Sequence, residues 1–349
     1  MLYRITFPAG FEPLVTTLIR RDFPGSTIEG SQEDRSSCIV EIPQTIPVKK
    51  PAYAQGWAPV LDSFAAPSFL GACEILSHRL SPEFLRTKEL MNRAQKGYSI
   101  RSFVVRSFDR GQPTAMPLGV RKKVERYFIQ LWKTLPDSQR PDLEVILHFR
   151  SDHRAQVILQ QRDRRETEPP KGALPPSTTR LVLELSEPQG DDILLDPFMG
   201  SGSIPLERAR MGPFSMIFAG DRDGALVESF KKKLGEPPWN SKRRTIFPKV
   251  LDGLDLRGFE EGFLTKIVTD PPWGHWEPMD DGALRRFYTQ FFKEAGRTLR
   301  TGGSMVALTG REIPIEPAME DSEAPWKLEE NFEVLISGRK ARLVKIRKI

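Results

Sequence analysis

In the C-terminal half, acidic residues and glycines repeatedly follow apolar runs, at points where a β-strand would end. The clearest case is the run KIVT, which leads into Asp270-Pro271-Pro272-Trp273. Two prolines stiffen this turn and remove two N–H donors, which leaves the carbonyl oxygens and the Asp270 carboxylate as acceptors. Such acceptors suit an exocyclic amine, and the flat face of Trp273 suits the stacking of an unpaired or flipped base. The alternative is a rigid loop around a buried indole.

A glycine-rich segment, Asp196-Pro197-Phe198-Met199-Gly200-Ser201-Gly202, lies between an expected strand and an expected helix. Gly200 and Gly202 allow a tight turn and a close approach of the backbone to a ligand. The segment therefore favours a nucleotide or adenosyl ligand, and the alternative is a plain tight turn. A dinucleotide fingerprint would need a third glycine at position 205, where this chain has Pro205, so a nicotinamide dehydrogenase is disfavoured.

Two further aspartates end expected strands. Asp221 can accept hydrogen bonds from both hydroxyls of a ribose, although Asp223 is close enough to compete for that role. Asp252 follows the weak strand candidate TIFPKVL and can accept from an adenine amino group. For each of these aspartates the alternative is a cap at the start of the next helix.

The elements that would position these residues alternate between strand and helix from about Leu181 onward. We expect strands at DILLD, PFSMIFAGD, TKIVTD and SMVALTG, and helices at SIPLERARM, DGALVESFKKKLG and GALRRFYTQFFKEAGRTL. Repeated βα units predict an α/β fold with a doubly wound, mostly parallel sheet covered by helices on both faces. FEVLISG and ARLVKIR, joined by a turn at Gly338-Arg339-Lys340, predict a terminal antiparallel hairpin.

The N-terminal half has a different pattern, which predicts an α+β region. LYRITFP, FEPLVTTLIRRDF and SSCIVEIP are expected as strand, helix and strand, and the proline-rich residues 43–72 as an irregular connector. A helix over 81–95, a strand at RSFVVRSF, an amphipathic helix at LGVRKKVERYFIQLWKTL, and strands at LEVILHF and AQVILQQ follow. The polar, proline-rich stretch near residues 161–176 is the expected domain boundary.

Basic charge is concentrated in the N-terminal half. Residues 1–180 contain 27 basic and 19 acidic residues, whereas residues 181–349 contain 25 and 27. This imbalance favours a polyanion-binding region attached to a nearly neutral domain, and the alternative is solvated surface charge. The candidate RNA-binding residues are Arg106, Arg110, Arg121, Lys122 and Lys123.

Composition excludes several classes of protein. A chain of 349 residues with 39% hydrophobic and 28% charged residues is long enough for two or three folded domains. Two cysteines without a CxxC pair, and four scattered histidines, provide no disulfide framework and no metal site. We find no signal-peptide pattern and no apolar run long enough to span a membrane, so we expect a cytoplasmic protein without metal or membrane partners.

Taken together, LLDPFMGSGSI, Asp221, Asp252 and TDPPWG resemble the class I S-adenosylmethionine-dependent methyltransferases that modify exocyclic amines. The motif DPFMGSGSI, with ALPPSTTRLVLEL upstream and a basic α+β segment before it, is similar to the corresponding sequences of the THUMP-domain RNA guanine-N2 methyltransferases. The resemblance implies a ferredoxin-like unit with linker at 1–60, a THUMP-like RNA-binding domain at 61–165 and a Rossmann-like methyltransferase domain at 174–349. It also implies S-adenosylmethionine as cofactor and tRNA as the RNA partner of a monomeric enzyme.

The resemblance implies direct methyl transfer to guanine N2. Within the catalytic turn Asp270-Pro271-Pro272-Trp273, Asp270 and a carbonyl of Pro271 would accept from the amine, while Trp273 would stack on the base. The cofactor would be bound by Asp196, Phe198, Gly200, Ser201, Gly202, Asp221 and Asp252. Many relatives have Asn-Pro-Pro-Tyr where this chain has Asp-Pro-Pro-Trp, which leaves the position of the target nucleotide open. The alternatives are an amino-methyltransferase acting on ribosomal RNA or DNA, and an RNA-binding protein with an inactive methyltransferase-like domain.

Overall fold

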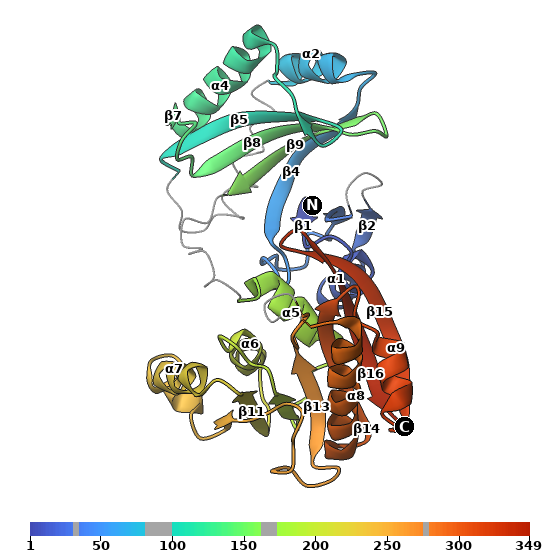
Figure 1. Cartoon of the computed structure of the whole chain (residues 1–349). Coiled ribbons are helices and arrows are strands. Elements are labelled where there is room, and N and C mark those ends of the chain that lie inside the picture. Colours follow the sequence, from blue (N-terminus) through green and yellow to red (C-terminus); the bar gives the residue numbers. More distant parts are fainter. Residues whose placement is uncertain (31–34, 81–99, 162–172, 275–278) are drawn as a thin grey trace. The chain divides into compact units, whose positions relative to one another are not determined.

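The computed structural model describes residues 1–30, 35–80, 100–161, 173–274 and 279–349. The chain folds into two compact units, Met1–Glu168 and Pro169–Ile349, which are described separately (Figure 1). The division between them falls within the proline-rich stretch 161–176. The helix expected over 81–95 lies outside the described residues.

The first unit contains one mixed sheet with helices packed against it. Its elements are β1 (Leu2–Thr6), α1 (Glu12–Asp22), β2 (Thr27–Gly30), β3 (Ser37–Glu41), β4 (Gly56–Ala65), α2 (Phe69–Arg79), β5 (Ser102–Asp109), β6 (Gln112–Pro113), α4 (Leu118–Trp132), β7 (Leu135–Pro136), β8 (Leu143–Phe149) and β9 (Arg154–Gln161). The strand order is β2-β3-β1-β4-β9-β8-β5-β6, and β7 pairs with β5. The N-terminal half is therefore α+β, as its pattern predicts.

The long strand β4 joins the two halves of this sheet. Its residue Trp57 lies opposite Ile5 of β1, while Val60 lies opposite Ile158 of β9. The expectation of an irregular connector over 43–72 was wrong for this stretch, because Pro59 within an apolar run disfavours a strand and only the pairing on both sides overrides it. The boundary expected at residue 60 falls inside β4.

The apolar face of α4 packs on β5, as the helical periodicity predicts. Phe128 is buried, stacks on Trp132 with ring centroids 4.5 Å apart and contacts Phe103 of β5. The opposite face of α4 carries Arg121, Lys122 and Lys123, all exposed. The sequence of this helix thus separates a buried aromatic face from a basic face.

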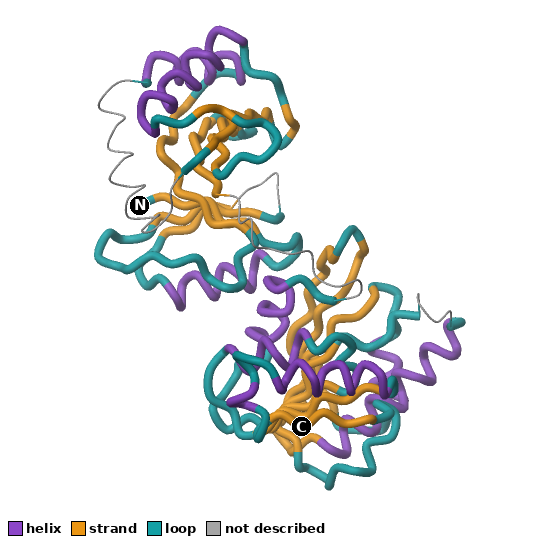
Figure 2. The backbone as a smooth tube through the Cα atoms, turned by 90° about the vertical axis from the view of Figure 1, so that its left-hand side faces the viewer, coloured by secondary structure: helices purple, strands orange, loops and turns teal. Residues whose placement is uncertain are grey.

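The second unit is a seven-stranded sheet with helices beside it (Figure 2). Its elements are α5 (Pro176–Leu185), β10 (Ile193–Asp196), α6 (Ser203–Arg210), β11 (Met216–Asp221), α7 (Gly224–Gly235), the short 3₁₀ helix η2 (Asn240–Lys242), β12 (Ile246–Val250), β13 (Leu264–Thr269), α8 (Asp281–Thr298), β14 (Leu299–Gly310), α9 (Ile315–Asp321), β15 (Trp326–Ile336) and β16 (Arg339–Lys348). The strand order is β12-β11-β10-β13-β14-β16-β15.

All pairings in this sheet are parallel except those of β16, which runs antiparallel to β14 and β15. The expected doubly wound sheet with a terminal antiparallel hairpin is confirmed, and TIFPKVL forms the edge strand β12, where Pro248 is tolerated. The hairpin turn lies earlier than expected, at Ser337 and Gly338. Both residues have positive φ, as a two-residue turn between twisted strands requires.

Strand order decides where a ligand can bind in this unit. From β10 the chain winds outward to β11 and β12, then returns to start β13 on the other side of β10. Loops that leave two such neighbouring strands in opposite directions open a crevice at their carboxyl ends. The loops after β10, β11, β12 and β13, which carry the predicted site residues, all leave this one edge.

Candidate active site

The loop after β10 turns on two glycines with different surroundings. Gly200 has φ +50°, and a Cβ added there would meet nothing within 4 Å. Gly202 has φ +81°, and a Cβ added there would lie 2.2 Å from the ring of Phe230 on α7. Gly202 is therefore required by packing, whereas Gly200 borders open space at the carboxyl edge of the sheet.

Asp221, at the end of β11, lies against this loop. Its carboxylate accepts from the backbone N–H of Gly200 at 2.9 Å and from that of Asp223 at 2.9 Å. Asp223 instead caps α7, because its own carboxylate accepts from Ala225 N at 2.8 Å. Of the two aspartates considered for ribose binding, Asp221 is thus the one whose carboxylate lies beside the glycine loop. Asp223 is a helix cap, which was the alternative considered for these aspartates.

Asp252 begins the loop between β12 and β13. Its side chain is exposed, and one carboxylate oxygen accepts from Leu254 N at 2.9 Å in a local turn. Phe198, from the loop after β10, packs over the neighbouring Gly253, where a Cβ would lie 2.3 Å from its ring. The structure thus brings Phe198 and the Asp252 loop together at the edge where Gly200 and Asp221 lie.

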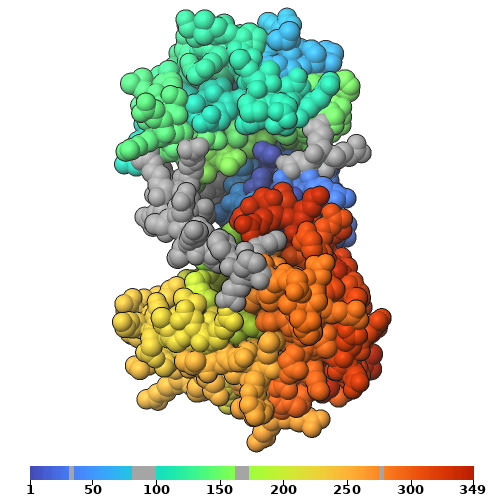
Figure 3. Space-filling view, viewed as in Figure 1, coloured from blue at the N-terminus to red at the C-terminus, as the bar shows by residue number. Residues whose placement is uncertain are grey.

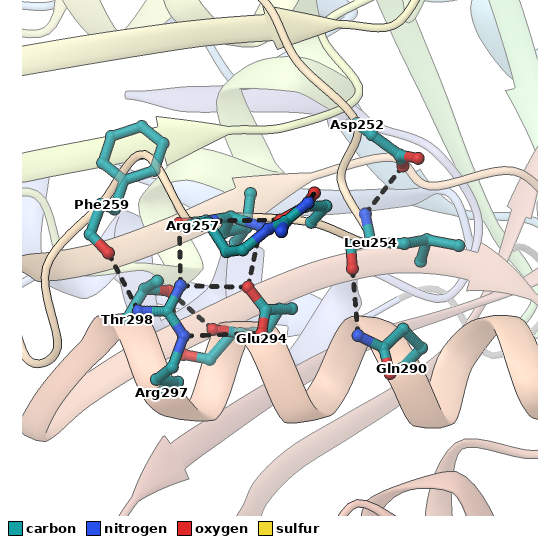
Figure 4. Close-up of polar contacts among 11 residues, drawn as sticks. Asp252, Leu254, Arg257, Phe259, Gln290, Glu294, Arg297 and Thr298 are labelled. Atoms are coloured by element: carbon teal, nitrogen blue, oxygen red, sulfur yellow. Dashed lines mark hydrogen bonds and ion pairs between the residues drawn. The ribbon is translucent and has the colours of Figure 1, made fainter.

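Side chains of helix α8 bind backbone groups of the loop that carries Asp252 (Figure 4). Gln290 donates to Leu254 O at 3.0 Å, and Glu294 accepts from Leu256 N at 2.8 Å. Arg297 donates to Leu256 O at 2.8 Å, to Phe259 O at 2.9 Å and to the Glu294 carboxylate at 3.0 Å. Because these side chains satisfy loop backbone groups, they fix the conformation of the segment that carries Asp252.

Asp196 lies beneath the glycine loop and is only 1% exposed. Its Oδ1 accepts from the Thr269 hydroxyl at 2.8 Å and from Phe198 N at 3.3 Å. Its Oδ2 is buried and has no hydrogen-bond partner among the described residues. Burial raises the pKa of this carboxyl to about 8, and the nearby Asp270 and Asp221 carboxylates add to that direction.

Asp270 and Trp273 are hydrogen-bonded to each other. The indole N–H of Trp273 donates to Asp270 Oδ1 at 2.9 Å and also approaches Leu308 O of β14 at 3.2 Å. Burial raises the pKa of Asp270 to about 7, while the bond from Trp273 acts in the opposite direction. The sequence predicts that Trp273 stacks on a base, and it does not predict that its polar edge holds the neighbouring carboxylate.

The two prolines of this turn are fixed by α8. Pro271 is buried, and the hydroxyl of Tyr288, a fully buried residue, donates to Pro272 O at 2.9 Å. Tyr288 is a site residue that sequence reasoning missed. The only signal was a polar aromatic residue on the apolar face of the expected helix, which must find a partner when buried.

The candidate RNA-binding residues lie in the first unit. Arg121, Lys122 and Lys123 are exposed residues of α4. This helix belongs to the blue-green part of the chain in Figure 3. Arg121 pairs with Glu125 at 2.8 Å, Arg106 on β5 pairs with Glu144 at 3.0 Å, and Arg110 lies in the turn after β5. Lys122 and Lys123 carry charge that no described acidic residue pairs with.

Metal sites and membrane spans are absent from the described part of the chain. The described residues contain no group of three or more histidine, cysteine, aspartate or glutamate side chains able to hold a metal ion. No helix in the described ranges is long and apolar enough to cross a membrane.

The geometry suits an adenosyl ligand. Open space beside Gly200, an acceptor carboxylate at Asp221 and a second acceptor at Asp252 lie along one sheet edge, in the order expected for the ribose and the adenine. Next to them, Asp270 presents an acceptor in a stiffened turn. A doubly wound sheet with this edge and an antiparallel last strand defines a Rossmann-like transferase domain of the methyltransferase class.

The chain belongs to the UPF0020 family, described as an RMKL-like methyltransferase domain, whose family model matches residues 162–342. It is 25% identical over 176 residues to the tRNA (guanine(10)-N2)-dimethyltransferase of Methanothermobacter thermautotrophicus, over 50% of this chain and 49% of that protein. It is 32% identical over 154 residues to the tRNA (guanine(6)-N2)-methyltransferase of Thermus thermophilus, over 43% of each chain. The chain thus spans about half the length of these curated relatives or less.

The fold of the whole chain resembles a solved structure, that of TrmN from Thermus thermophilus. The TM-score is 0.76 at 23% sequence identity, and the alignment covers 100% of this chain and 99% of the other. This likeness confirms the predicted α/β fold class with its Rossmann-like, mostly parallel sheet.

Proposed function

We propose that this protein transfers a methyl group from S-adenosylmethionine to the exocyclic N2 of a guanosine in tRNA. The observation that carries the proposal is the Asp270-Pro271-Pro272-Trp273 turn, which presents acceptor oxygens at the end of β13, beside the glycine loop after β10. The names of two relatives, which are tRNA guanine-N2 methyltransferases, support the choice of target atom.

The residues of the glycine loop and its neighbours would hold the cofactor. Asp221 would accept from the ribose hydroxyls and Asp252 from the adenine amino group, while Gly200 would lie against the ligand without a side chain. Phe198 would close the adenine side, since it already packs over Gly253. When bound, S-adenosylmethionine supplies an electrophilic methyl group on its sulfonium sulfur.

The catalytic turn would orient the amine. Guanine N2 is a poor nucleophile because its lone pair is delocalised, and hydrogen bonds from its N–H groups to Asp270 and to a carbonyl of the turn would direct that lone pair toward the methyl group. The Pro271 carbonyl expected to make this contact is consistent with the structure, since the Pro272 carbonyl already accepts from Tyr288. Transfer would form a C–N bond and break the C–S bond, and N2 would lose a proton. Asp270 could accept this proton because burial raises its pKa to about 7.

The first unit would bind the RNA. Its basic face on α4 and the residues Arg106 and Arg110 supply positive charge for phosphates. We assign this unit the RNA-holding role of a ferredoxin-like and THUMP-like region, and we expect the protein to act as a monomer in the cytoplasm. Recognition of this kind reads the shape of a folded RNA, so it does not specify which guanosine is modified.

The test is a transfer assay with isotopically labelled S-adenosylmethionine and unmodified tRNA transcripts, followed by digestion and mass spectrometry of the nucleosides. We expect labelled N2-methylguanosine. The matched control is Asp270→Ala, which should abolish transfer while it leaves cofactor binding nearly unchanged. Equal loss of both activities in this variant would show that the turn after β13 does not have the assigned role.

Two other results would redirect the proposal. Label in ribosomal RNA or DNA, but not in tRNA, would retain the methyltransferase chemistry and replace the substrate. Cofactor binding without transfer to any nucleic acid would favour an RNA-binding protein whose methyltransferase domain is inactive.

A further inference from the structure

We propose that Trp273 is a positioning residue for Asp270: its indole N–H holds Oδ1 of the carboxylate and so presents Oδ2 to the substrate amine. The inference rests on the proposed function and deepens it, because it gives Trp273 a role other than base stacking. The indole N–H has one proton to donate, and its shorter contact, 2.9 Å, is to Asp270.

The indole is held in place from several sides. Its N–H lies between Asp270 Oδ1 and Leu308 O of β14, at 2.9 Å and 3.2 Å. At the end of β14, a Cβ added to Gly310 would lie 3.4 Å from the Cβ of Trp273, so the strand closely approaches the start of this side chain. A carboxylate bonded to a ring that is itself fixed loses rotational freedom about its last torsion, which orients its second oxygen.

The surroundings of Asp270 make this bond important for its charge. The titratable groups near it among the described residues are Asp196 below the glycine loop and Tyr288 on α8. Glu312 lies near Gly310, the residue of β14 that approaches Trp273. None of these provides a positive charge, and no described lysine or arginine forms an ion pair with Asp270. A partly buried carboxylate without a cation depends on hydrogen-bond donors to remain ionised, and the indole N–H is the described side-chain donor to it.

This arrangement predicts a pH-dependent effect that stacking does not. The bond from the indole favours the ionised carboxylate, so its loss should raise the pKa of Asp270. Transfer needs the ionised Asp270 carboxylate to accept from the amine, so the acidic limb of the pH–rate profile should move to higher pH when the indole bond is lost. A hydrogen bond to a charged group corresponds to a shift of about one pH unit.

The first experiment needs neither cofactor nor RNA. In ¹⁵N-labelled full-length protein, the indole cross-peak of Trp273 is assigned by its absence in Trp273→Phe and followed as the pH is raised. We expect this peak to titrate with a midpoint near the pKa of Asp270, about 7. In Asp270→Asn the same peak should show no such titration. A wild-type peak that does not respond to pH would overturn the proposal.

The second experiment measures transfer to tRNA against pH. Replacing Trp273 by 3-benzothienylalanine keeps a bicyclic ring and removes the N–H. The midpoint of the acidic limb of the pH–rate profile should therefore shift to higher pH by about one unit, while the rate at high pH recovers. The control is Trp326→Phe, because the indole nitrogen of Trp326 is buried without a partner among the described residues. The acidic limb of the pH–rate profile of this variant should stay at the wild-type position.

The outcomes separate this inference from the proposed function. If the wild-type protein methylates tRNA but the benzothienyl variant loses activity equally at every pH, Trp273 acts through its face alone and the positioning role is wrong. If the wild-type protein forms no N2-methylguanosine, the proposed function fails, while the indole titration still decides whether Trp273 and Asp270 are coupled.

Discussion

At the scale of single residues, the two glycines of the loop after β10 provide a matched pair. In Gly202→Ala the new methyl group would meet the Phe230 ring at 2.2 Å in a positive-φ conformation, so we expect the free energy of unfolding to fall by about 2 kcal/mol or more. In Gly200→Ala the methyl group points into open space, so only the conformational cost of about 1 kcal/mol applies.

In cofactor binding the order should be reversed, with the larger loss in Gly200→Ala. Gly200→Ala would place a methyl group where the loop approaches the ligand, and we expect the dissociation constant for S-adenosylmethionine to rise at least about tenfold. Calorimetric binding and chemical denaturation measure the two effects separately. Unchanged affinity in Gly200→Ala would mean that the cofactor does not contact this loop.

The buried Asp196 predicts a dependence of stability on pH. Its pKa is about 8 in the folded protein and near 4 when unfolded, so the folded state retains a proton that the unfolded state has released between these values. The contribution of Asp196 to the free energy of unfolding is therefore fully present below about pH 4. This free energy falls by a few kcal/mol as the pH rises toward about 8. In Asp196→Asn this loss is absent.

The measurement is the difference in melting temperature between Asp196→Asn and the wild-type protein, from about pH 5 to about pH 8. The difference should change in favour of the variant as pH rises, whatever the fixed cost of placing an amide there. A constant difference would show that Asp196 is ionised in the folded protein throughout this range.

At the scale of elements, α8 connects the two halves of the site. Tyr288 bonds to the catalytic turn, while Gln290, Glu294 and Arg297 bond to the loop that carries Asp252. The helix forms because its apolar residues recur on one face and Asp280 caps its start, accepting from Ala283 N at 2.7 Å. A change on its polar face should therefore affect cofactor binding from a distance.

We expect Arg297→Met to raise the dissociation constant for S-adenosylmethionine by about tenfold, because the carbonyls of Leu256 and Phe259 lose a charged donor. The control is Arg285→Met on the same helix, which removes an exposed pair with Asp321 and should change neither affinity nor stability by more than about 0.5 kcal/mol. Titration calorimetry compares the two variants. Equal affinities would exclude a role of α8 in holding the adenine side.

At the scale of the whole molecule, the charge imbalance predicts which unit binds RNA. Reversing Lys122 and Lys123 to glutamate should weaken tRNA binding and lower the salt dependence by about one unit of slope for each phosphate that the variant no longer neutralises. Arg121 is expected to contribute less, because it already pairs with Glu125.

Binding is measured between about 50 and 200 mM salt, where such slopes are resolved. Reversal of Lys232 and Lys233, exposed cations at the end of α7 in the second unit, is the control and should have a smaller effect. If the α7 variant loses more affinity than the α4 variant, the main RNA face lies on the methyltransferase unit.

The sequence alone determined the local features of this protein. Alternating apolar runs determined the order of strands and helices in the second unit. Gly200, Gly202 and the Asp270-Pro271-Pro272 turn were recognisable because their backbone chemistry acts within a few residues. The strand-end positions of Asp221 and Asp252 then followed from the parallel sheet, since all its strands present their carboxyl ends at one edge.

Only the tertiary structure decided which groups meet. Trp273 and Leu308 lie 35 residues apart, Arg297 and Leu256 lie 41 apart, and neither residue of each pair indicates the other. Pro59 made β4 look irregular until its pairing with β1 and β9 was known. The physical reason is that propensity acts between chain neighbours, whereas burial and hydrogen-bond satisfaction depend on the elements that the fold brings alongside.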